Sequence, residues 1–344
     1  MSTKKDKFSL KDKFYMEIAL KLANSRQGLT GTNPSVGCVI VKNDKIVSIG
    51  QTSYNGRPHA EFNAIENCID DLNGSKMYVT LEPCCHHGLT PPCTNIIIKS
   101  KISEVIYSVS DIDKRVRNKS LKILKSNKIK VKKGLLDDKI NNFYSNYFFN
   151  RKNQLPYVTG KIAVSKNNLI YSKLNKKITN RHSDKFTHLL RYKNDALMVT
   201  YKTLNNDNPK LNCRIKGFSN FSPKRIILDN KLQTKINTYV INTANKNNTL
   251  IFYNQAKKSK ILEFKNKKIQ LIKSKINQQG KFDIKAILKK LYTHNCRNLL
   301  IEGGDSLTSH LLKNKIFNRF YLYKSPKNIP KETEYLKFNS LDVL

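Results

Sequence analysis

The segment from Pro58 to Cys93 constrains this chain more than any other. It opens with a Pro-His-Ala-Glu sequence and closes with a Pro-Cys pair, a polar loop and a second cysteine. An imidazole and two thiolates are ligands that zinc prefers, and a zinc ion with three protein ligands keeps a fourth position for water. Zinc also lowers the pKa of that water to about 7. We therefore expect His59, Cys84 and Cys93 to bind zinc.

A carboxylate two residues after the histidine completes the pattern. In zinc-dependent nucleobase deaminases, a glutamate in His-x-Glu is not a ligand and acts as general acid and base. Glu61 is the candidate for this proton transfer. Taken singly, such a histidine or cysteine is more often structural, and only their combination favours a catalytic site. Three neighbours are also possible ligands by type but rank lower, because the turn can present only some side chains inward: Cys85, His86 and His87.

The apolar pattern around this segment predicts a layered α/β domain. We expect helices over 11–25 and 120–125, one after Pro58 and one beginning beside Cys93, with strands over 36–41, 45–50, 77–81, 104–109 and 128–131. His59 and Cys93 would then lie at helix N-termini, which favour thiolate over thiol. His59 and Glu61 can converge only if both occupy the first turn of their helix.

The net charge of +39 is the strongest feature of the composition. It suggests either nucleic-acid binding or a lysine-rich coding bias. The lysines are spread along the whole chain without an aromatic-interleaved RNA motif, which favours the bias. We expect no nucleic-acid partner, although the field would help attract an anionic phosphate ester. No apolar run of 18 residues or signal peptide is evident, and seven cysteines form no obvious disulfide framework, so a cytoplasmic enzyme without membrane association is expected.

The spacing of the two cysteines narrows the class of deaminase that this chain resembles. Most nucleobase deaminases have Cys-x-x-Cys, whereas eight residues separate Cys84 from Cys93. With Thr-Leu-Glu-Pro before Cys84, and with the segment from Thr32 to Val41, the chain resembles the bacterial bifunctional riboflavin-biosynthesis deaminase/reductase family. The resemblance implies that Asn33 contacts the pyrimidine substrate. Cys85 stands where the family usually has a serine.

The resemblance covers nearly the whole chain. It implies a cytidine-deaminase-like three-layer domain over 1–145, a linker over 146–156 and a dihydrofolate-reductase-like α/β domain over 157–344. The second domain would use NADPH to reduce the ribosyl group of the deaminated product to a ribityl chain. The motifs that carry this part of the resemblance are 189–191, 203–214, 225–229 and 301–307.

Several of these motifs have a physical rationale. The strand 299–301, the pair Gly303-Gly304 and a helix from Asp305 would form an anion site suited to cofactor phosphates. Arg191 and Arg214 can each bind a substrate phosphate through two parallel hydrogen bonds, which a lysine could not do as specifically. By resemblance, the cofactor contacts are Ala163, Thr203, Asp207, Gly304, Asp305 and Ser306, and the substrate contacts are Arg191, Leu211, Arg214 and Glu302. No Gly-x-Gly-x-x-Gly follows a strand, so a Rossmann domain is not supported.

The expected function is therefore a two-step enzyme, a zinc hydrolase and an NADPH-dependent oxidoreductase. It would deaminate a 2,5-diamino-6-(phosphoribosylamino)pyrimidinone and reduce the product, and a homo-oligomer is expected. Three features depart from the family: a shorter loop over 167–177, Lys177 in place of an aromatic residue, and a short C-terminal end after Tyr323. They leave open a single-step nucleobase or RNA-editing deaminase with a basic C-terminal module, or with a degenerate second domain kept only for oligomer contacts.

Overall fold

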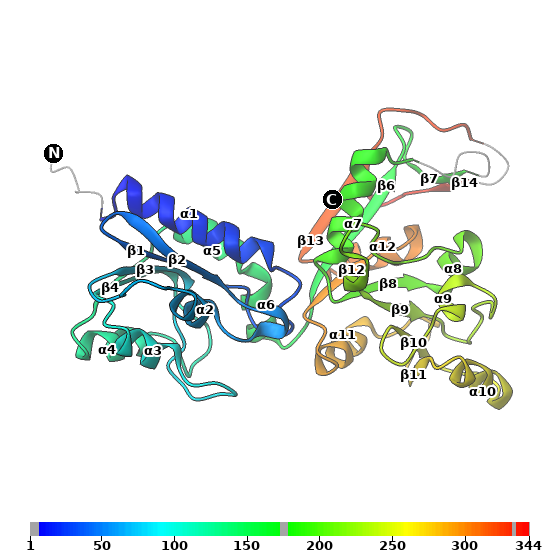
Figure 1. Ribbon diagram of the computed structural model, residues 1–344. Coiled ribbons are helices and arrows are strands. Elements are labelled where there is room, and N and C mark those ends of the chain that lie inside the picture. The colour runs from blue at the N-terminus through cyan, green and yellow to red at the C-terminus, as the bar shows by residue number, and fades with distance from the viewer. Residues whose placement is uncertain (1–6, 173–177, 332–334, 344) are drawn as a thin grey trace. The chain divides into compact units, whose positions relative to one another are not determined.

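The computed structural model describes residues 7–172, 178–331 and 335–343. The chain divides between Gln154 and Leu155 into two compact units, which Figure 1 shows with their elements labelled. Lys177, where the family usually has an aromatic residue, lies outside the described residues. Within the described ranges, no helix is both long enough and apolar enough to cross a bilayer.

The first unit is built on a five-stranded sheet in the order β2-β1-β3-β4-β5. Strand β1 is antiparallel to β2 and β3, whereas β3, β4 and β5 are parallel to one another. The strands are β1 (Gly37–Lys42), β2 (Lys45–Gln51), β3 (Lys76–Leu81), β4 (Glu104–Val109) and β5 (Lys130–Lys133). The helices are α1 (Leu10–Ser25), η1 (Tyr54–Gly56), α2 (Ala60–Glu66), α3 (Cys93–Lys99), α4 (Lys119–Ser126), α5 (Asp137–Phe143) and α6 (Ser145–Asn153).

Helices cover both faces of this sheet, with α1 and α5 on one side and α2, α3 and α4 on the other (Figure 1). Two glycines allow the helices to approach closely. A Cβ atom at Gly37 would overlap the carbonyl oxygen of Ala19 in α1, and one at Gly50 would overlap that of Ala60 in α2. The close contact of α2 with the sheet fixes the position of the His-x-Glu segment. The three-layer fold expected for this part of the chain is confirmed.

Three details of the first unit differ from the sequence-based expectation. Strand β5 begins at Lys130 rather than at Lys128, because Lys128 has a φ of 61° and ends the turn after α4. The apolar spacing of Ala60, Ala64, Ile65 and Cys68 predicts that all four share the inner face of the helix after Pro58, but α2 ends at Glu66, and Cys68 lies beyond it and is only partly buried. Most of the expected linker forms α6, because Tyr147 is buried in the core and its hydroxyl donates to Asp111 Oδ1 at 3.1 Å.

The second unit contains a seven-stranded sheet in the order β11-β10-β9-β8-β12-β6-β13, in which all neighbours are parallel. Its strands are β6 (Tyr157–Val164), β8 (Ala196–Thr200), β9 (Lys224–Leu228), β10 (Thr249–Tyr253), β11 (Gln270–Lys273), β12 (Asn298–Ile301) and β13 (Arg319–Lys324). A separate antiparallel pair joins β7 (Leu169–Ser172) to β14 (Tyr335–Lys337).

The helices of this unit follow the strands and leave both faces of the sheet buried. They are α7 (Arg181–Tyr192), α8 (Tyr201–Asp207), η2 (Ser219–Phe221), α9 (Tyr239–Asn242), α10 (Lys258–Asn266), α11 (Ile284–Thr293), α12 (Asp305–Lys313) and η3 (Leu341–Val343). In β8, Ala196 and Met198 enter one core cluster while Leu197 and Val199 enter another. Burial on both faces is the reason this strand is a continuous apolar run.

The order of the strands places one edge of the sheet in a position typical of ligand sites. Strand β12 lies between β8 and β6, although three further strands separate β8 from β12 in the sequence. In open parallel sheets, ligands bind at the carboxyl ends of strands where the strand order reverses. Here those ends lead into α8, which follows β8, and α12, which follows β12.

Candidate active sites

The zinc-ligating residues expected from the sequence converge in the first unit. The ligand atoms of His59, Cys84 and Cys93 all lie within 4.8 Å of one another, and no other such group of histidine, cysteine and carboxylate side chains occurs among the described residues. His59 Nδ1 lies 3.5 Å from Cys84 Sγ and 3.4 Å from Cys93 Sγ. Zinc–nitrogen bonds of about 2.0 Å and zinc–sulfur bonds of about 2.3 Å fit a group of this size. The donor set therefore suits a zinc ion.

Three elements of the first unit position these atoms. His59 is the N-cap residue of α2, Cys84 follows the end of β3, and Cys93 is the first residue of α3. The backbone N–H of Cys93 donates to Cys84 Sγ at 3.2 Å, and that of Thr94 donates to the Cys84 carbonyl at 3.1 Å. Hydrogen bonds from the Cys93 thiol, from His59 and from the Cys93 amide lower the pKa of Cys84 to about 4 although burial opposes them. The site thus favours a thiolate.

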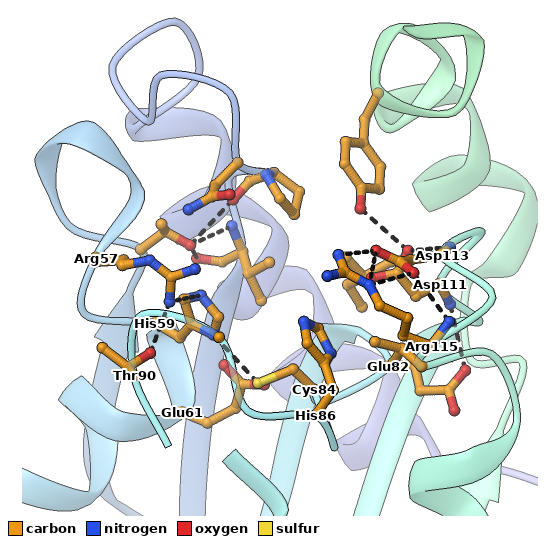
Figure 2. A pocket seen from close by; sticks show the side chains of 18 of the residues that line it. Arg57, His59, Glu61, Glu82, Cys84, His86, Thr90, Asp111, Asp113 and Arg115 are labelled. Carbon is orange, nitrogen blue, oxygen red and sulfur yellow. Dashed lines mark hydrogen bonds and ion pairs between the residues drawn. The ribbon is translucent and has the colours of Figure 1, made fainter. Parts of the chain in front are cut away.

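Glu61 lies in the first turn of α2, two residues after His59, and both line one pocket (Figure 2). Its side chain is buried, and this burial raises the pKa of Glu61 to about 7. A carboxyl group that titrates near neutral pH can both accept and release a proton. The pocket is open to solvent, and about 710 Å³ of space lies within it when the open solvent at its mouth is included. Asn33 also lines it, and its amide donates to the carbonyl of Gly56 at 3.1 Å.

The three other candidate ligands, Cys85, His86 and His87, do not belong to the cluster. Cys85 Sγ is directed to the carbonyl oxygen of Arg115 at 3.5 Å, and its neighbour His86 lines the pocket without joining the group of ligand atoms. His87 is exposed. The turn after β3 therefore presents one of two consecutive cysteines to the cluster, as the sequence led us to expect.

Sequence reasoning missed the wall of the pocket that faces this cluster. Glu82 is buried and accepts hydrogen bonds from Ser120 Oγ at 2.6 Å, Asn118 N at 3.1 Å and Asp111 N at 3.3 Å. It thereby holds the loop after β4, which carries the pocket residue Asp113. A signal was available, because β3 and β4 are parallel neighbours and residues that follow them meet at one edge of the sheet.

In the second unit, the expected cofactor residues lie where strands end and helices begin. Ala163 is near the end of β6, Thr203 and Asp207 are in α8, and Asp305 and Ser306 form the first turn of α12. Gly304 is the N-cap of α12, and a Cβ atom added there would meet nothing within 4 Å. Open space before a helix N-terminus suits a phosphate group.

The four expected substrate residues of the second unit lie in different environments. Arg191 and Glu302 form an ion pair with each other. Leu211 is buried and has a φ of 51°. Arg214 is exposed, with its Nη1 donating to Asn212 Oδ1 at 3.0 Å. Sequence reasoning did not single out Lys161, whose pKa burial lowers although Glu302 opposes this shift.

Two family models match the chain. The cytidine and deoxycytidylate deaminase zinc-binding region matches residues 9–109, and the RibD C-terminal domain matches residues 160–333. The riboflavin biosynthesis protein RibD of Aquifex aeolicus is 34% identical over 92% of this chain and 87% of its own length. That of Actinobacillus pleuropneumoniae is 35% identical over 93% of this chain and 85% of its own length.

Solved structures agree with these matches over both units. A diaminohydroxyphosphoribosylaminopyrimidine deaminase/5-amino-6-(5-phosphoribosylamino)uracil reductase from Thermotoga maritima has a TM-score of 0.81 at 29% identity and covers 95% of this chain and 89% of its own. Acinetobacter baumannii RibD has a TM-score of 0.83 at 25% identity, with 96% and 90% covered. The two units, their order and the His/Cys/Cys group together show that the chain belongs to the RibD family of riboflavin biosynthesis proteins, bifunctional enzymes with a zinc-dependent deaminase and an NADPH-dependent reductase.

Proposed function

We propose that this chain hydrolytically deaminates a 2,5-diamino-6-(phosphoribosylamino)pyrimidinone and then reduces the ribosyl group of the product to a ribityl chain. The observation that carries the proposal is the convergence of His59, Cys84, Cys93 and Glu61 on one open pocket of the first unit. The Thermotoga maritima relative, whose name describes both reactions, supports the choice of substrate.

In the deaminase half, His59, Cys84 and Cys93 would hold the zinc ion, which would supply an activated water. Glu61 would accept a proton, pass it to a ring nitrogen and donate a proton to the departing amine. Its burial beside the cluster supports this role, because the carboxyl titrates near neutral pH. Asn33, which also lines the pocket, hydrogen-bonds the pyrimidine.

In the reductase half, the N-terminus of α12 with Gly304, Asp305 and Ser306 binds phosphate of the cofactor, and Ala163, Thr203 and Asp207 contact the rest of it. NADPH supplies the hydride. Glu302 and Leu211 contact the ribosyl substrate, and Arg214 binds its phosphate. Arg191 was expected to bind phosphate as well; its two bonds to Glu302 favour a role in orienting that carboxylate.

A coupled assay on the purified full-length protein tests the proposal. We expect release of one ammonia and consumption of one NADPH for each substrate molecule. Ammonia release without NADPH consumption would support a single-step deaminase instead, and steeply salt-dependent RNA binding would support the editing alternative.

We also propose a cytoplasmic location and a homo-oligomeric assembly. The ligand thiolates must stay reduced to bind zinc, which fits a reducing compartment. Light scattering of the purified protein tests the assembly, and a monomer at micromolar concentration would contradict it.

A further inference from the structure

Three arginines line the pocket of the first unit, and two of them face carboxylates. Arg115 donates from Nε to Asp113 Oδ1 at 3.0 Å and from Nη2 to Oδ2 at 2.6 Å. Arg115 lowers the pKa of Asp113 to about 2, so this pair stays ionised at neutral pH. The guanidinium of Arg151 lies 5.4 Å from the ring centre of Tyr147 and interacts with the charges of Asp111 and Asp113.

Arg57 is different, because no carboxylate forms an ion pair with it in the described part of the chain. Its Nη1 donates to Thr90 Oγ1 at 2.7 Å and lies 3.4 Å from His59 Nε2 (Figure 2). Gly88 of the same loop lies beside the guanidinium, and a Cβ atom there would be in ordinary van der Waals contact with Nη2, at 3.6 Å.

The contact with His59 does not occupy Arg57 when the metal site is filled. His59 Nδ1 faces the two thiols, so Nδ1 is the nitrogen that would bind the ion. A neutral imidazole that coordinates through Nδ1 carries its proton on Nε2 and cannot accept a hydrogen bond there. Arg57 has five N–H donors, and the Thr90 hydroxyl takes one of them. The remaining donors are available to a ligand in the pocket.

The charges of the pocket walls indicate which ligand this is. The wall that faces the zinc cluster carries Glu82, Asp111 and Asp113, and its two arginines, Arg115 and Arg151, already interact with these carboxylates, so the described residues of this wall offer an anionic ligand no free cation. A guanidinium without a carboxylate partner matches a phosphate, to which it can donate two parallel hydrogen bonds. We propose that Arg57 binds the phosphate of the substrate in the deaminase pocket and makes this site selective for phosphorylated pyrimidines. This inference rests on the proposed function and adds to it a residue that recognises the substrate phosphate.

The test compares ammonia release from the phosphorylated substrate and from the same compound without its phosphate. For Arg57→Ala, we expect the KM for the phosphorylated substrate to rise by about 10- to 100-fold, the range for losing charge-assisted hydrogen bonds. The KM for the dephosphorylated compound should rise by a much smaller factor, and zinc content should stay at the wild-type level. Arg57→Lys keeps the positive charge but cannot donate two parallel hydrogen bonds. Its KM for the phosphorylated substrate should therefore lie between those of the wild type and Arg57→Ala.

Arg115→Ala is the matched control, because it removes an arginine of the same pocket that is already paired with Asp113. We expect it to change the kinetics of the two compounds by the same factor. Inorganic phosphate should inhibit wild-type deamination of the dephosphorylated compound competitively and should inhibit Arg57→Ala much less.

The possible failures can be told apart. Equal loss on both compounds in Arg57→Ala, or loss of zinc in both Arg57→Ala and Arg57→Gln, would overturn the assignment and give Arg57 a structural role. An unchanged preference for the phosphorylated compound would overturn it as well. If the wild-type protein releases ammonia from neither compound, the proposed function itself fails.

Discussion

Arg191 and Glu302 form a two-point ion pair inside the second unit, with Nε–Oε1 at 2.7 Å and Nη2–Oε2 at 2.8 Å. Their side chains are only 11% and 15% exposed. Burial alone would raise the pKa of Glu302, but the charge and hydrogen bonds of Arg191 overcome this and hold the pKa below its usual value. The pair fixes a carboxylate at the carboxyl edge of the parallel sheet, directly before the glycines that precede α12.

Removing the arginine should strongly destabilise the second unit. Arg191→Met leaves Glu302 as a buried carboxylate without its partner, and breaking such a pair costs about 3–5 kcal/mol. Urea unfolding of the full-length protein, followed by circular dichroism, measures the loss. In the double variant Arg191→Met/Glu302→Gln, the unpaired charge is absent, so much of the stability should return. Equal destabilisation in the single and double variants would contradict this explanation.

The same pair gives a pH dependence with a definite sign. The pKa of Glu302 is lowered by folding, so the stability it contributes is complete above the unfolded value of about 4.3 and is lost as the pH falls through the lower, folded value. In Arg191→Met, burial instead raises the pKa of Glu302. The deficit of the variant relative to wild type should therefore be largest at neutral pH and shrink as the pH falls toward 4. Unfolding curves at several pH values test this, and a constant deficit would count against it.

Tyr144 links three segments of the first unit through buried hydrogen bonds. Its hydroxyl donates to the carbonyl oxygen of Ser35 at 2.9 Å and lies 2.6 Å from Thr80 Oγ1. Tyr144→Phe should cost about 1–3 kcal/mol of unfolding free energy, because it removes the hydroxyl donor of the buried Ser35 carbonyl and one hydrogen bond of Thr80 Oγ1, which then keeps only the bond from the Gly37 N–H at 3.2 Å. The exposed Tyr335→Phe is the control and should change stability by less than about 0.5 kcal/mol. Thermal unfolding compares the two, and similar small effects would contradict the role of Tyr144.

Two adjacent cysteines allow a sharp test of the metal site. Cys84→Ser should lower the zinc content of the purified protein from about one per chain to near zero, because a ligand thiolate is lost. Cys85→Ser should retain full zinc, since Cys85 Sγ is directed to the carbonyl of Arg115. Elemental analysis measures both variants. Zinc loss in Cys85→Ser but not in Cys84→Ser would mean that Cys85, and not Cys84, is the ligand.

Much of the first unit could be predicted because its signals are local. The apolar runs gave β1, β3 and β4, and the His-x-Glu segment before α2 gave two site residues. Helix α6 was missed because its polar and aromatic composition resembles a linker, and only the contact of Tyr147 with Asp111 shows why it packs.

Pairings between distant residues could not be predicted in this way. Glu302 and Arg191 are 111 positions apart, and both were expected to face substrate because each belongs to a motif that the family shares. Arg57 and Thr90 lie in separate loops, and nothing in the sequence distinguishes Arg57 from the many other cations of a chain with a net charge of +39. Such contacts depend on how strands and loops meet at one sheet edge.

The assignment of deamination to the Glu61 site and of reduction to the second unit is tested most directly by Glu61→Gln. This variant keeps the size of the side chain but cannot carry the proton. Ammonia release should fall by about 10²- to 10⁴-fold, while the zinc content stays the same. Oxidation of NADPH with the pre-deaminated substrate should continue at the wild-type rate. Ammonia release at the wild-type rate from this variant would contradict the assignment of Glu61 and with it the proposed deaminase site.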